Sequence, residues 1–262
     1  MTHSSDAGSL KRGVAFLKLL ATGGVRGCPL SELAEKSGVP HPSAHRILKQ
    51  LIAERLVVHD AETHRYRLGP LAFELGLAGS MLHDIRDLCE PAMAALARET
   101  EDTAYLVVRS GFEAVCLHRI EGDFPIRTLV LQVGSRRPLG VGAGGLAVLA
   151  AIAPEERQAI IERVAPALPA FGKLTEAGLR QACEDTARAG VAVIQNRVSL
   201  GVTAVGAHFG DSMGQAMGAV SVAALTQRMT AARVRRIAQQ VRAAAADIEL
   251  RIRMRKPESP RR

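Results

Sequence analysis

Residues 30–56 read LSELAEKSGVPHPSAHRILKQLIAERL, and this stretch decides the fold of the first part of the chain. A short helix is predicted from Ser31 to Ser37, ending at Gly38, where a left-handed backbone conformation costs least. A second helix is predicted from Pro42, a residue type that suits the first helical turn. Its apolar residues fall on one side: Ala44, Ile47, Leu48, Leu51 and Leu56. The stretch is therefore predicted to form two short helices that meet across a tight turn.

The segments on either side extend this helix pair into a small domain. A first helix is predicted over residues 10–21, where apolar residues recur at helical spacing. Two extended runs, residues 56–58 and 66–68, flank the polar turn at residues 60–64 and predict a hairpin. A hairpin that directly follows a helix-turn-helix is a wing, so a winged helix-turn-helix is expected.

The segment after the wing, residues 71–82, is apolar almost all round, which a lone surface helix does not sustain in water. It is predicted to be buried between domains or subunits. The chain is then expected to divide into five parts: a flexible N-terminus (1–8), the winged helix-turn-helix domain (9–70), a linker helix (71–84), a larger domain (85–254) and a flexible basic tail (255–262).

The larger domain is predicted to be an antiparallel sheet with packed helices. Helices are predicted over residues 88–100, 142–153, 154–164, 175–189 and 230–254. Strands are predicted over residues 103–108, 114–119, 127–133, 191–194, 202–209 and 217–225. Hairpin connections such as the one near Gly111 are typical of antiparallel pairing, so the fold class is predicted to be α+β.

The composition is that of an ordinary globular protein with two domains, with 47% hydrophobic and 23% charged residues among 262. The longest weakly polar stretch, residues 139–153, is too short to span a membrane, so a cytoplasmic protein is expected. The four cysteines stand singly, which predicts neither a zinc site nor a disulfide framework. Residues 228–262 carry a net charge of +8, which indicates a solvated basic face or an auxiliary phosphate contact.

Two separated motifs resemble those of one known family. The first combines LSELA at residues 30–34, VPHPSAHRIL at 39–48 and YRLG at 66–69. The second is VGSRRPL at residues 133–139, followed by GAG at 142–144. In this order and at this spacing, the motifs resemble the IclR-type transcriptional regulators over nearly the whole chain.

The resemblance implies a winged helix-turn-helix, a linker helix that pairs subunits, and a GAF-like C-terminal domain that binds a small organic molecule. It also implies a homodimer or homotetramer on a partly palindromic operator in double-stranded DNA, acting as repressor or activator. It implies no enzymatic activity.

Recognition of DNA requires an exposed helical face that enters the major groove and offers donors to bases and phosphates. Arg46 is the leading candidate, because a guanidinium binds guanine or phosphate with two parallel hydrogen bonds. His41 and Pro42 stand where the family more often has Lys and Ser, which favours a distinct operator. The predicted DNA contacts are Ser31, His41, Pro42, Ser43, His45, Arg46, Lys49 and Gln50 on the helices, and Arg65 and Arg67 in the wing.

Residues 140–145 formally match G-x-G-x-x-G, which raises a nucleotide-binding alternative. A dinucleotide fold requires a parallel βαβ unit, whereas a second helix is predicted here over residues 154–164. A bare helix start instead favours an anion such as a carboxylate.

By resemblance, Gly142 and Ala143 supply backbone donors and Ser221 a hydroxyl. Ile194, Ala204 and Ala223 stand where polar groups are common in the family, so a larger acid, such as an aromatic one, is expected. The predicted effector residues are Gly142, Ala143, Gly144, Ile194, Ala204, Ser221 and Ala223.

Two other classes of function stay open. An enzyme requires a nucleophile with its base or a set of metal ligands, and no histidine has such a partner at a recognisable spacing. No catalytic residue, metal or cofactor is therefore expected. A ligand-sensing module that acts on protein partners shares the C-terminal features, but it leaves the basic outward face of residues 43–50 unexplained.

Overall fold

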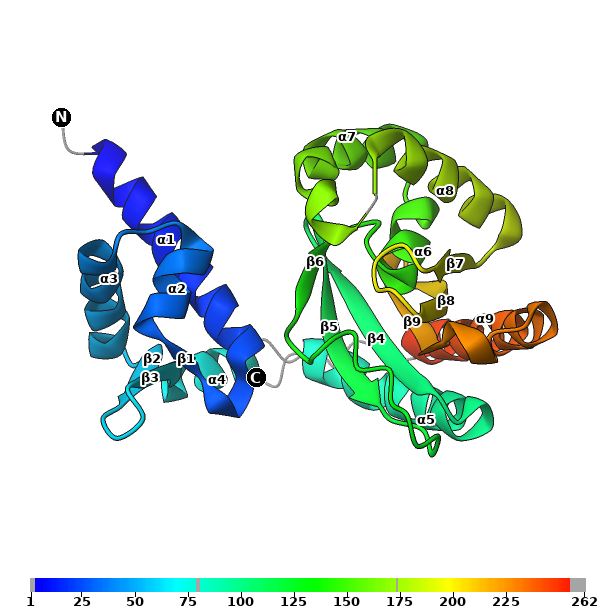
Figure 1. The fold of residues 1–262 in the computed structure, drawn as a ribbon, viewed down its shortest axis with the longest axis horizontal. Coiled ribbons are helices and arrows are strands. Elements are labelled where there is room, and N and C mark those ends of the chain that lie inside the picture. The colour runs from blue at the N-terminus through cyan, green and yellow to red at the C-terminus, as the bar shows by residue number, and fades with distance from the viewer. Residues whose placement is uncertain (1–2, 79–80, 173, 255–262) are drawn as a thin grey trace. The chain divides into compact units, whose positions relative to one another are not determined.

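The computed structural model describes residues 3–78, 81–172 and 174–254. The chain forms two compact units, Met1–His83 and Asp84–Arg262, each built around its own hydrophobic core (Figure 1). The division falls at the end of the segment predicted to link the two domains.

The N-terminal unit packs three helices against a small antiparallel sheet with strand order β1-β3-β2 (Figure 1). Its elements are α1 (His3–Gly23), β1 (Cys28–Pro29), α2 (Leu30–Ser37), α3 (His41–Ala53), β2 (Val57–Asp60) and β3 (Arg65–Leu68), with a 3-10 turn at Gly24–Arg26. Phe16, Leu20, Leu33 and Leu48 fill the core and are at most 1% exposed. The predicted winged helix-turn-helix is confirmed.

Local residues fix the two turns of this unit. Gly38 has φ +66°, and its N–H donates to the carbonyls of the last turn of α2, which is the predicted left-handed helix end. In the wing, Asp60 Oδ1 accepts hydrogen bonds from the N–H groups of Glu62 and Thr63, at 3.0 and 3.1 Å. The hairpin then closes through the antiparallel pairing of β2 with β3.

Three features of this half of the chain differ from the prediction. Helix α1 begins at His3, so residues 3–8, expected to be flexible, are helical; a glycine at position 8 costs a helix only about 1 kcal/mol. Strand β1 was not predicted, because two residues are too few for a periodicity and only pairing with β3 defines them. The linker segment forms α4 (Pro70–Ala78), and a new helix begins at Met81; residues 79–80 lie outside the described part.

The C-terminal unit is built on a six-stranded antiparallel sheet with strand order β6-β5-β4-β9-β8-β7 (Figure 1). Its strands are β4 (Thr103–Ser110), β5 (Glu113–Ile120), β6 (Arg136–Pro138), β7 (Ala192–Gln195), β8 (Val202–Gly210) and β9 (Ala216–Leu225). Its helices are α5 (Met81–Thr100), α6 (Ala143–Ala151), α7 (Pro154–Val164), α8 (Glu176–Ala189) and α9 (Ala231–Met254), with 3-10 turns at Ala165–Phe171 and Thr226–Arg228. The predicted α+β class is confirmed.

The sheet separates two hydrophobic cores. Leu106 and Val108 point to the face covered by α5 and α9, whereas Val107 between them points to the face covered by α6, α7 and α8. This alternation follows from the two-residue period of a strand. Helix α6 lies directly on the sheet, and all its residues from Ala143 to Ala150 are buried.

The strand predicted over residues 127–133 is wrong. Residues 121–135, called the strap from here on, run without regular structure, and the short strand β6 follows them. The backbone of Val130 is bonded to side chains instead of a strand: its N–H donates to the Tyr105 hydroxyl and its carbonyl accepts from Arg137. Other differences are smaller; α5 begins at Met81 rather than at residue 88, and the predicted tail, residues 255–262, lies outside the described part.

A buried carboxylate ties the start of β4 to the C-terminal helix. The side chain of Asp102 is 3% exposed, and its oxygens lie 2.8 Å from Arg233 Nη2 and 3.6 Å from Arg228 Nη1. The Asp102→Asn substitution removes the anion of Arg233 and one of the two carboxylates that Arg228 contacts, so it should lower the free energy of unfolding by about 3 kcal/mol.

Urea unfolding followed by circular dichroism measures this loss. Glu101→Gln is the matched control, because Glu101 contacts the same Arg228 at 3.2 Å from a side chain that is 61% exposed. The control should cost less than about 1 kcal/mol. Equal losses in the two variants would show that burial of Asp102 contributes nothing.

Candidate nucleic-acid interface and ligand pocket

Helix α3 presents a polar face opposite its buried one. Ala44, Ile47 and Leu48 face the core, which leaves the intervening residues outward. Of the predicted contacts on the two helices, Ser43 is half-buried and the others are exposed: Ser31, His41, Pro42, His45, Arg46, Lys49 and Gln50. The structure therefore brings the predicted residues of α3 together on one accessible helical surface.

Arg46 lies at the centre of this surface. Within the described residues, no hydrogen bond or ion pair engages its guanidinium, in contrast to Arg55, whose Nη2 lies 3.2 Å from Glu74 Oε1. A planar guanidinium with five donors and no internal acceptor is suited to bind a base edge or a phosphate.

The two wing arginines have internal partners, which the sequence reasoning did not foresee. Arg65 donates from Nε to the Arg26 carbonyl at 2.8 Å and from Nη2 to the Gly27 carbonyl at 3.1 Å. Arg67 Nη2 lies 2.9 Å from Asp60 Oδ2. Arg65 thus fastens the loop before β1 to the wing, and Arg67 supports the wing turn, so both residues stabilise the unit as well as adding positive charge.

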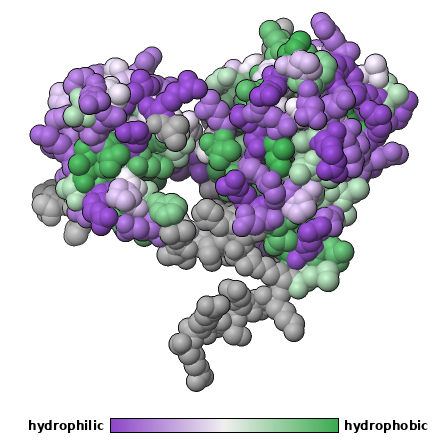
Figure 2. Space-filling model, turned by 90° about the horizontal axis from the view of Figure 1, so that it is seen from below, coloured by the Kyte–Doolittle hydropathy of each residue, from purple (hydrophilic) through white to green (hydrophobic). Residues whose placement is uncertain are grey.

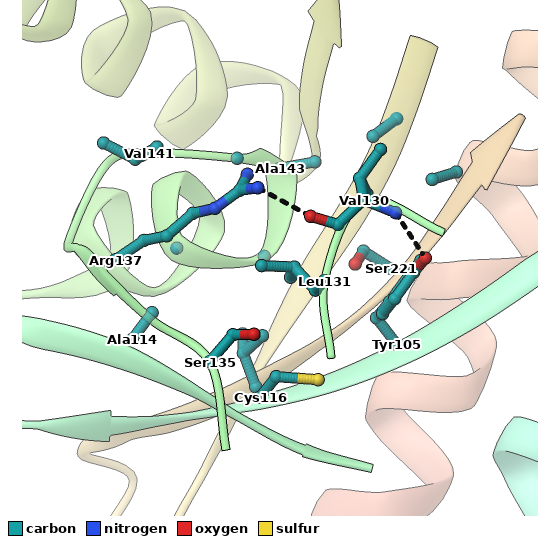
Figure 3. A pocket seen from close by; sticks show the side chains of 16 residues that line it. Tyr105, Ala114, Cys116, Val130, Leu131, Ser135, Arg137, Val141, Ala143 and Ser221 are labelled. Atoms are coloured by element: carbon teal, nitrogen blue, oxygen red, sulfur yellow. Dashed lines mark hydrogen bonds between the residues drawn. The ribbon is translucent and has the colours of Figure 1, made fainter. Parts of the chain in front are cut away.

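A pocket opens in the C-terminal unit where the start of α6 meets the sheet (Figure 3). Six of the seven predicted effector residues line it: Gly142, Ala143, Gly144, Ala204, Ser221 and Ala223. The remaining predicted residue, Ile194, does not line this pocket; its side chain packs in the core beneath α6, α7 and α8. Ile194 pairs with Ala204 but lies on β7, the edge strand farthest from β4 and β5.

No side chain of the described residues caps the helix start in this pocket. Gly142 precedes α6 with φ +80° and, having no side chain, caps none of the first N–H groups of the helix. Gly144 allows the close approach of helix and sheet, since a Cβ there would lie 2.7 Å from Val107. Ser221 is 6% exposed and lines the pocket, and its hydroxyl finds no hydrogen-bond partner in the described part of the chain.

Three polar side chains that were not predicted as effector residues also line the pocket: Arg137, Tyr105 and Ser135 (Figure 3). Arg137 Nη2 donates to the Val130 carbonyl at 2.6 Å. The Tyr105 hydroxyl accepts from the Val130 N–H at 3.1 Å and donates to the Thr128 carbonyl. Burial lowers the pKa of Arg137 and raises that of Tyr105.

The alternation of strand β6 accounts for the direction of Arg137. Successive residues of a strand point to opposite sides, and Arg136 pairs on the outside with Glu113, at 2.9 Å from Nη2 to Oε2. Arg137 must then point inward. The remaining walls are largely apolar, with Val107, Leu131 and Val141 among them.

All four cysteines are buried and none forms a disulfide. Cys116 lines the pocket, and burial raises the pKa of its thiol to about 11. Since the thiolate is the reactive form, Cys116 should react with iodoacetamide about 100-fold more slowly than a free thiol at pH 8. Peptide mass spectrometry after timed alkylation checks this against glutathione in the same tube. Alkylation at the glutathione rate would contradict the assigned pKa shift.

Some kinds of site are not found in the described residues. Within 3–78, 81–172 and 174–254, no group of His, Cys, Asp and Glu side chains has the arrangement of a metal site. Over the same ranges, no helix has both the length and the apolarity needed to cross a membrane. The G-x-G-x-x-G reading at residues 140–145 is also unsupported, because the sheet around it is antiparallel.

A winged helix-turn-helix with an exposed polar surface on α3, joined in one chain to an α+β unit, is the architecture of a DNA-binding transcriptional regulator. Comparisons with known proteins give the family. The model of the bacterial transcriptional regulator IclR C-terminal domain matches residues 80–250, and the IclR helix-turn-helix domain matches residues 9–61. The chain belongs to the IclR family.

Individual relatives agree with this family assignment. The chain is 30% identical over 224 residues to the HTH-type transcriptional regulator KipR of Bacillus subtilis, covering 85% of this chain and 89% of KipR. An IclR transcriptional regulator from Alicyclobacillus acidocaldarius has a similar fold, with a TM-score of 0.74 at 23% identity over 93% of this chain and 98% of that one.

An IclR homologue from Microbacterium hydrocarbonoxydans, solved as a complex with 4-hydroxybenzoate, gives a TM-score of 0.71 at 24% identity over 94% and 99% of the two chains. The family models and curated relatives that the chain matches are transcriptional regulators rather than enzymes.

Proposed function

We propose that this regulator binds an operator through α3 and that a small organic carboxylate in the pocket of the C-terminal unit controls this binding. The observation that carries the proposal is a set of donors in one largely apolar pocket that have no partner among the described residues: the uncapped start of α6 and the hydroxyl of Ser221. Donors without acceptors in a part-buried site favour an anionic oxygen ligand.

The DNA half of the proposal rests on the exposed surface of α3. Arg46 and Gln50, one helical turn apart, are placed to reach base edges, with His45 and Lys49 beside them for the phosphates. His41 and Pro42 begin the helix and give the operator its own sequence preference. Arg65 and Arg67 add charge near the backbone while they hold the wing.

The apolar walls suggest the kind of carboxylate. Ala204 and Ala223 leave room beside the sheet and offer no polar group, so an aromatic or branched acid is favoured over a small polar one. The relative from Microbacterium hydrocarbonoxydans is complexed with 4-hydroxybenzoate, an acid of this class. We therefore propose aromatic monocarboxylates as the first effectors to test.

We also propose that the chain acts as a homodimer or homotetramer on a partly palindromic operator, in the cytoplasm where its DNA lies. Phe73 and Leu75 on α4 are 64% and 58% exposed, and Figure 2 shows apolar side chains gathered on the surface of the N-terminal unit. Such side chains favour burial against a second subunit. Sedimentation of the Phe73→Glu variant tests this: a shift toward monomer is expected, and an unchanged mass would contradict pairing through α4.

A gel-shift with the DNA that flanks the protein's own gene tests the operator proposal. The full chain should retain that fragment in the presence of excess unrelated DNA, and affinity should fall by roughly 0.9 log units per log unit of salt for each phosphate contacted. Retention that is independent of salt, or lost to unrelated competitor, would favour the alternative of a ligand-sensing module with protein partners.

A further inference from the structure

The pocket contains an arginine whose charge has no internal partner. Arg137 is half-buried at the pocket wall, and within the described residues no carboxylate forms an ion pair with it. Its neighbours differ: Arg136 pairs with Glu113 at 2.9 Å, and Arg119 pairs with Glu121 at 2.8 Å. Burying part of a cation beside a neutral acceptor costs free energy unless an anion pairs with the cation.

We propose that Arg137 selects anionic effectors, and that an effector carboxylate takes the place of the Val130 carbonyl on its guanidinium. This inference rests on the proposed effector function and adds to it the residue that distinguishes an acid from a neutral molecule of the same shape. The guanidinium has five donors, and the recorded hydrogen bond to Val130 uses one of them. A bidentate carboxylate forms stronger, charge-assisted bonds than a carbonyl does.

The exchange has a consequence for the strap, residues 121–135. Side chains hold its middle: Arg137 donates to the Val130 carbonyl, and the Tyr105 hydroxyl accepts from the Val130 N–H (Figure 3). The Tyr105 hydroxyl also donates to the Thr128 carbonyl, and Arg119 donates to the Leu131 carbonyl at 3.2 Å. Val130 and Leu131 themselves line the pocket. When a ligand displaces the Val130 carbonyl from Arg137, the strap loses one of these attachments and changes its position.

The strap also reaches the end of α5. The N–H of Phe124 donates to the Glu101 carbonyl at 2.9 Å, and the guanidinium carbon of Arg228 lies 3.4 Å from the centroid of the Phe124 ring. Glu101 directly follows Thr100, the last residue of α5. The strap therefore contacts the residue that directly follows α5, the helix into which the linker segment leads.

Calorimetric titration of the full chain with benzoate, 4-hydroxybenzoate and the neutral isostere benzamide tests the selection. Wild type should bind at least one of the two carboxylates, and bind it more tightly than benzamide. Arg137→Met should weaken carboxylate binding by about tenfold or more and leave benzamide unchanged, whereas Arg137→Lys should restore part of the carboxylate preference. Equal losses for acid and amide, or no loss, would overturn the proposal, as would wild type that binds neither carboxylate.

The stability of Arg137→Met distinguishes effector selection from a merely structural role of Arg137. Removing a part-buried, unpaired charge should leave the urea midpoint unchanged or raise it. A lowered midpoint for Arg137→Met, together with equal weakening of acid and amide binding, would mean that Arg137 only holds the strap.

A tryptophan reporter tests the movement of the strap. The chain has no tryptophan, and Leu129 lies on the strap with 51% of its surface exposed. In the Leu129→Trp variant, benzoate should change the emission, and adding Arg137→Met should abolish that change. Phe112→Trp is the matched control, because Phe112 is 49% exposed but lies outside the strap. An emission that benzoate leaves unchanged at Leu129→Trp would contradict the exchange.

These ligand measurements require no DNA, so they separate the two proposals. Acid-selective binding that depends on Arg137, in a chain that retains no operator DNA, would remove the operator half of the proposed function and leave Arg137 as the selecting residue. Operator binding without acid selectivity would leave the operator half of the proposed function and remove Arg137 as the selecting residue.

Discussion

The Leu48→Ala variant is expected to lose about 2–5 kcal/mol of stability in the N-terminal unit, and with it DNA binding. Leu48 is fully buried on the inner face of α3, where it belongs to the same core cluster as Phe16 and Leu33 of the other helices. Alanine would leave a cavity at the point where all three helices meet. For a unit of this size, such a loss is a large share of the total free energy of folding.

Urea unfolding and a gel-shift on the same samples check this expectation. Leu10→Ala is the matched control, because Leu10 on α1 is 71% exposed and should change stability by less than about 0.5 kcal/mol. The pocket lies in the other compact unit, so benzoate binding should survive in both variants. A Leu48→Ala variant with wild-type stability would mean that α3 is not packed as described.

The Arg46→Ala variant is expected to weaken operator binding by about 1–3 kcal/mol without a change in stability. Arg46 is exposed on α3 and has no partner within the described residues, so no internal contact is lost. If the guanidinium reads a base, the loss should be greater for the operator than for unrelated DNA. If it binds a phosphate, both losses should be similar and the salt slope should fall by about 1.

Fluorescence anisotropy with labelled operator and unrelated DNA measures both losses. Arg12→Ala is the matched control, since Arg12 is an exposed arginine of the same unit that lies on α1 and not on α3. Unchanged operator affinity in Arg46→Ala would exclude Arg46 from the interface.

The sequence predicted best the elements whose signals are local. Gly38 and Pro42 mark the turn between α2 and α3, and Asp60 initiates the wing turn through its own side chain. The strands β4, β5, β8 and β9 were predicted because their long apolar runs extend over most of each strand. Such features need no knowledge of distant residues.

Long-range contacts account for what the sequence did not predict. The strap has the apolar content of a strand, but Tyr105 and Arg137 take the backbone groups of Val130, and neither contact leaves a local pattern. Ile194 was assigned to the pocket by resemblance to the family, whereas its side chain packs in the core from edge strand β7.

The direction of Arg137 follows from strand alternation only once β6 and the pairing of Arg136 with Glu113 are known. The predictions emphasised the glycines at the start of α6, so the adjacent arginine was overlooked, although it lies within the motif VGSRRPL at residues 133–139.

The measurement that most directly tests the central claim is the affinity of the full chain for the DNA flanking its own gene, with and without a saturating aromatic carboxylate. Fluorescence anisotropy should give two affinities that differ by about 5- to 150-fold, the usual range of coupling between two sites. The effect should be absent with benzamide. Identical affinities with the pocket filled and empty would contradict control of DNA binding by this pocket.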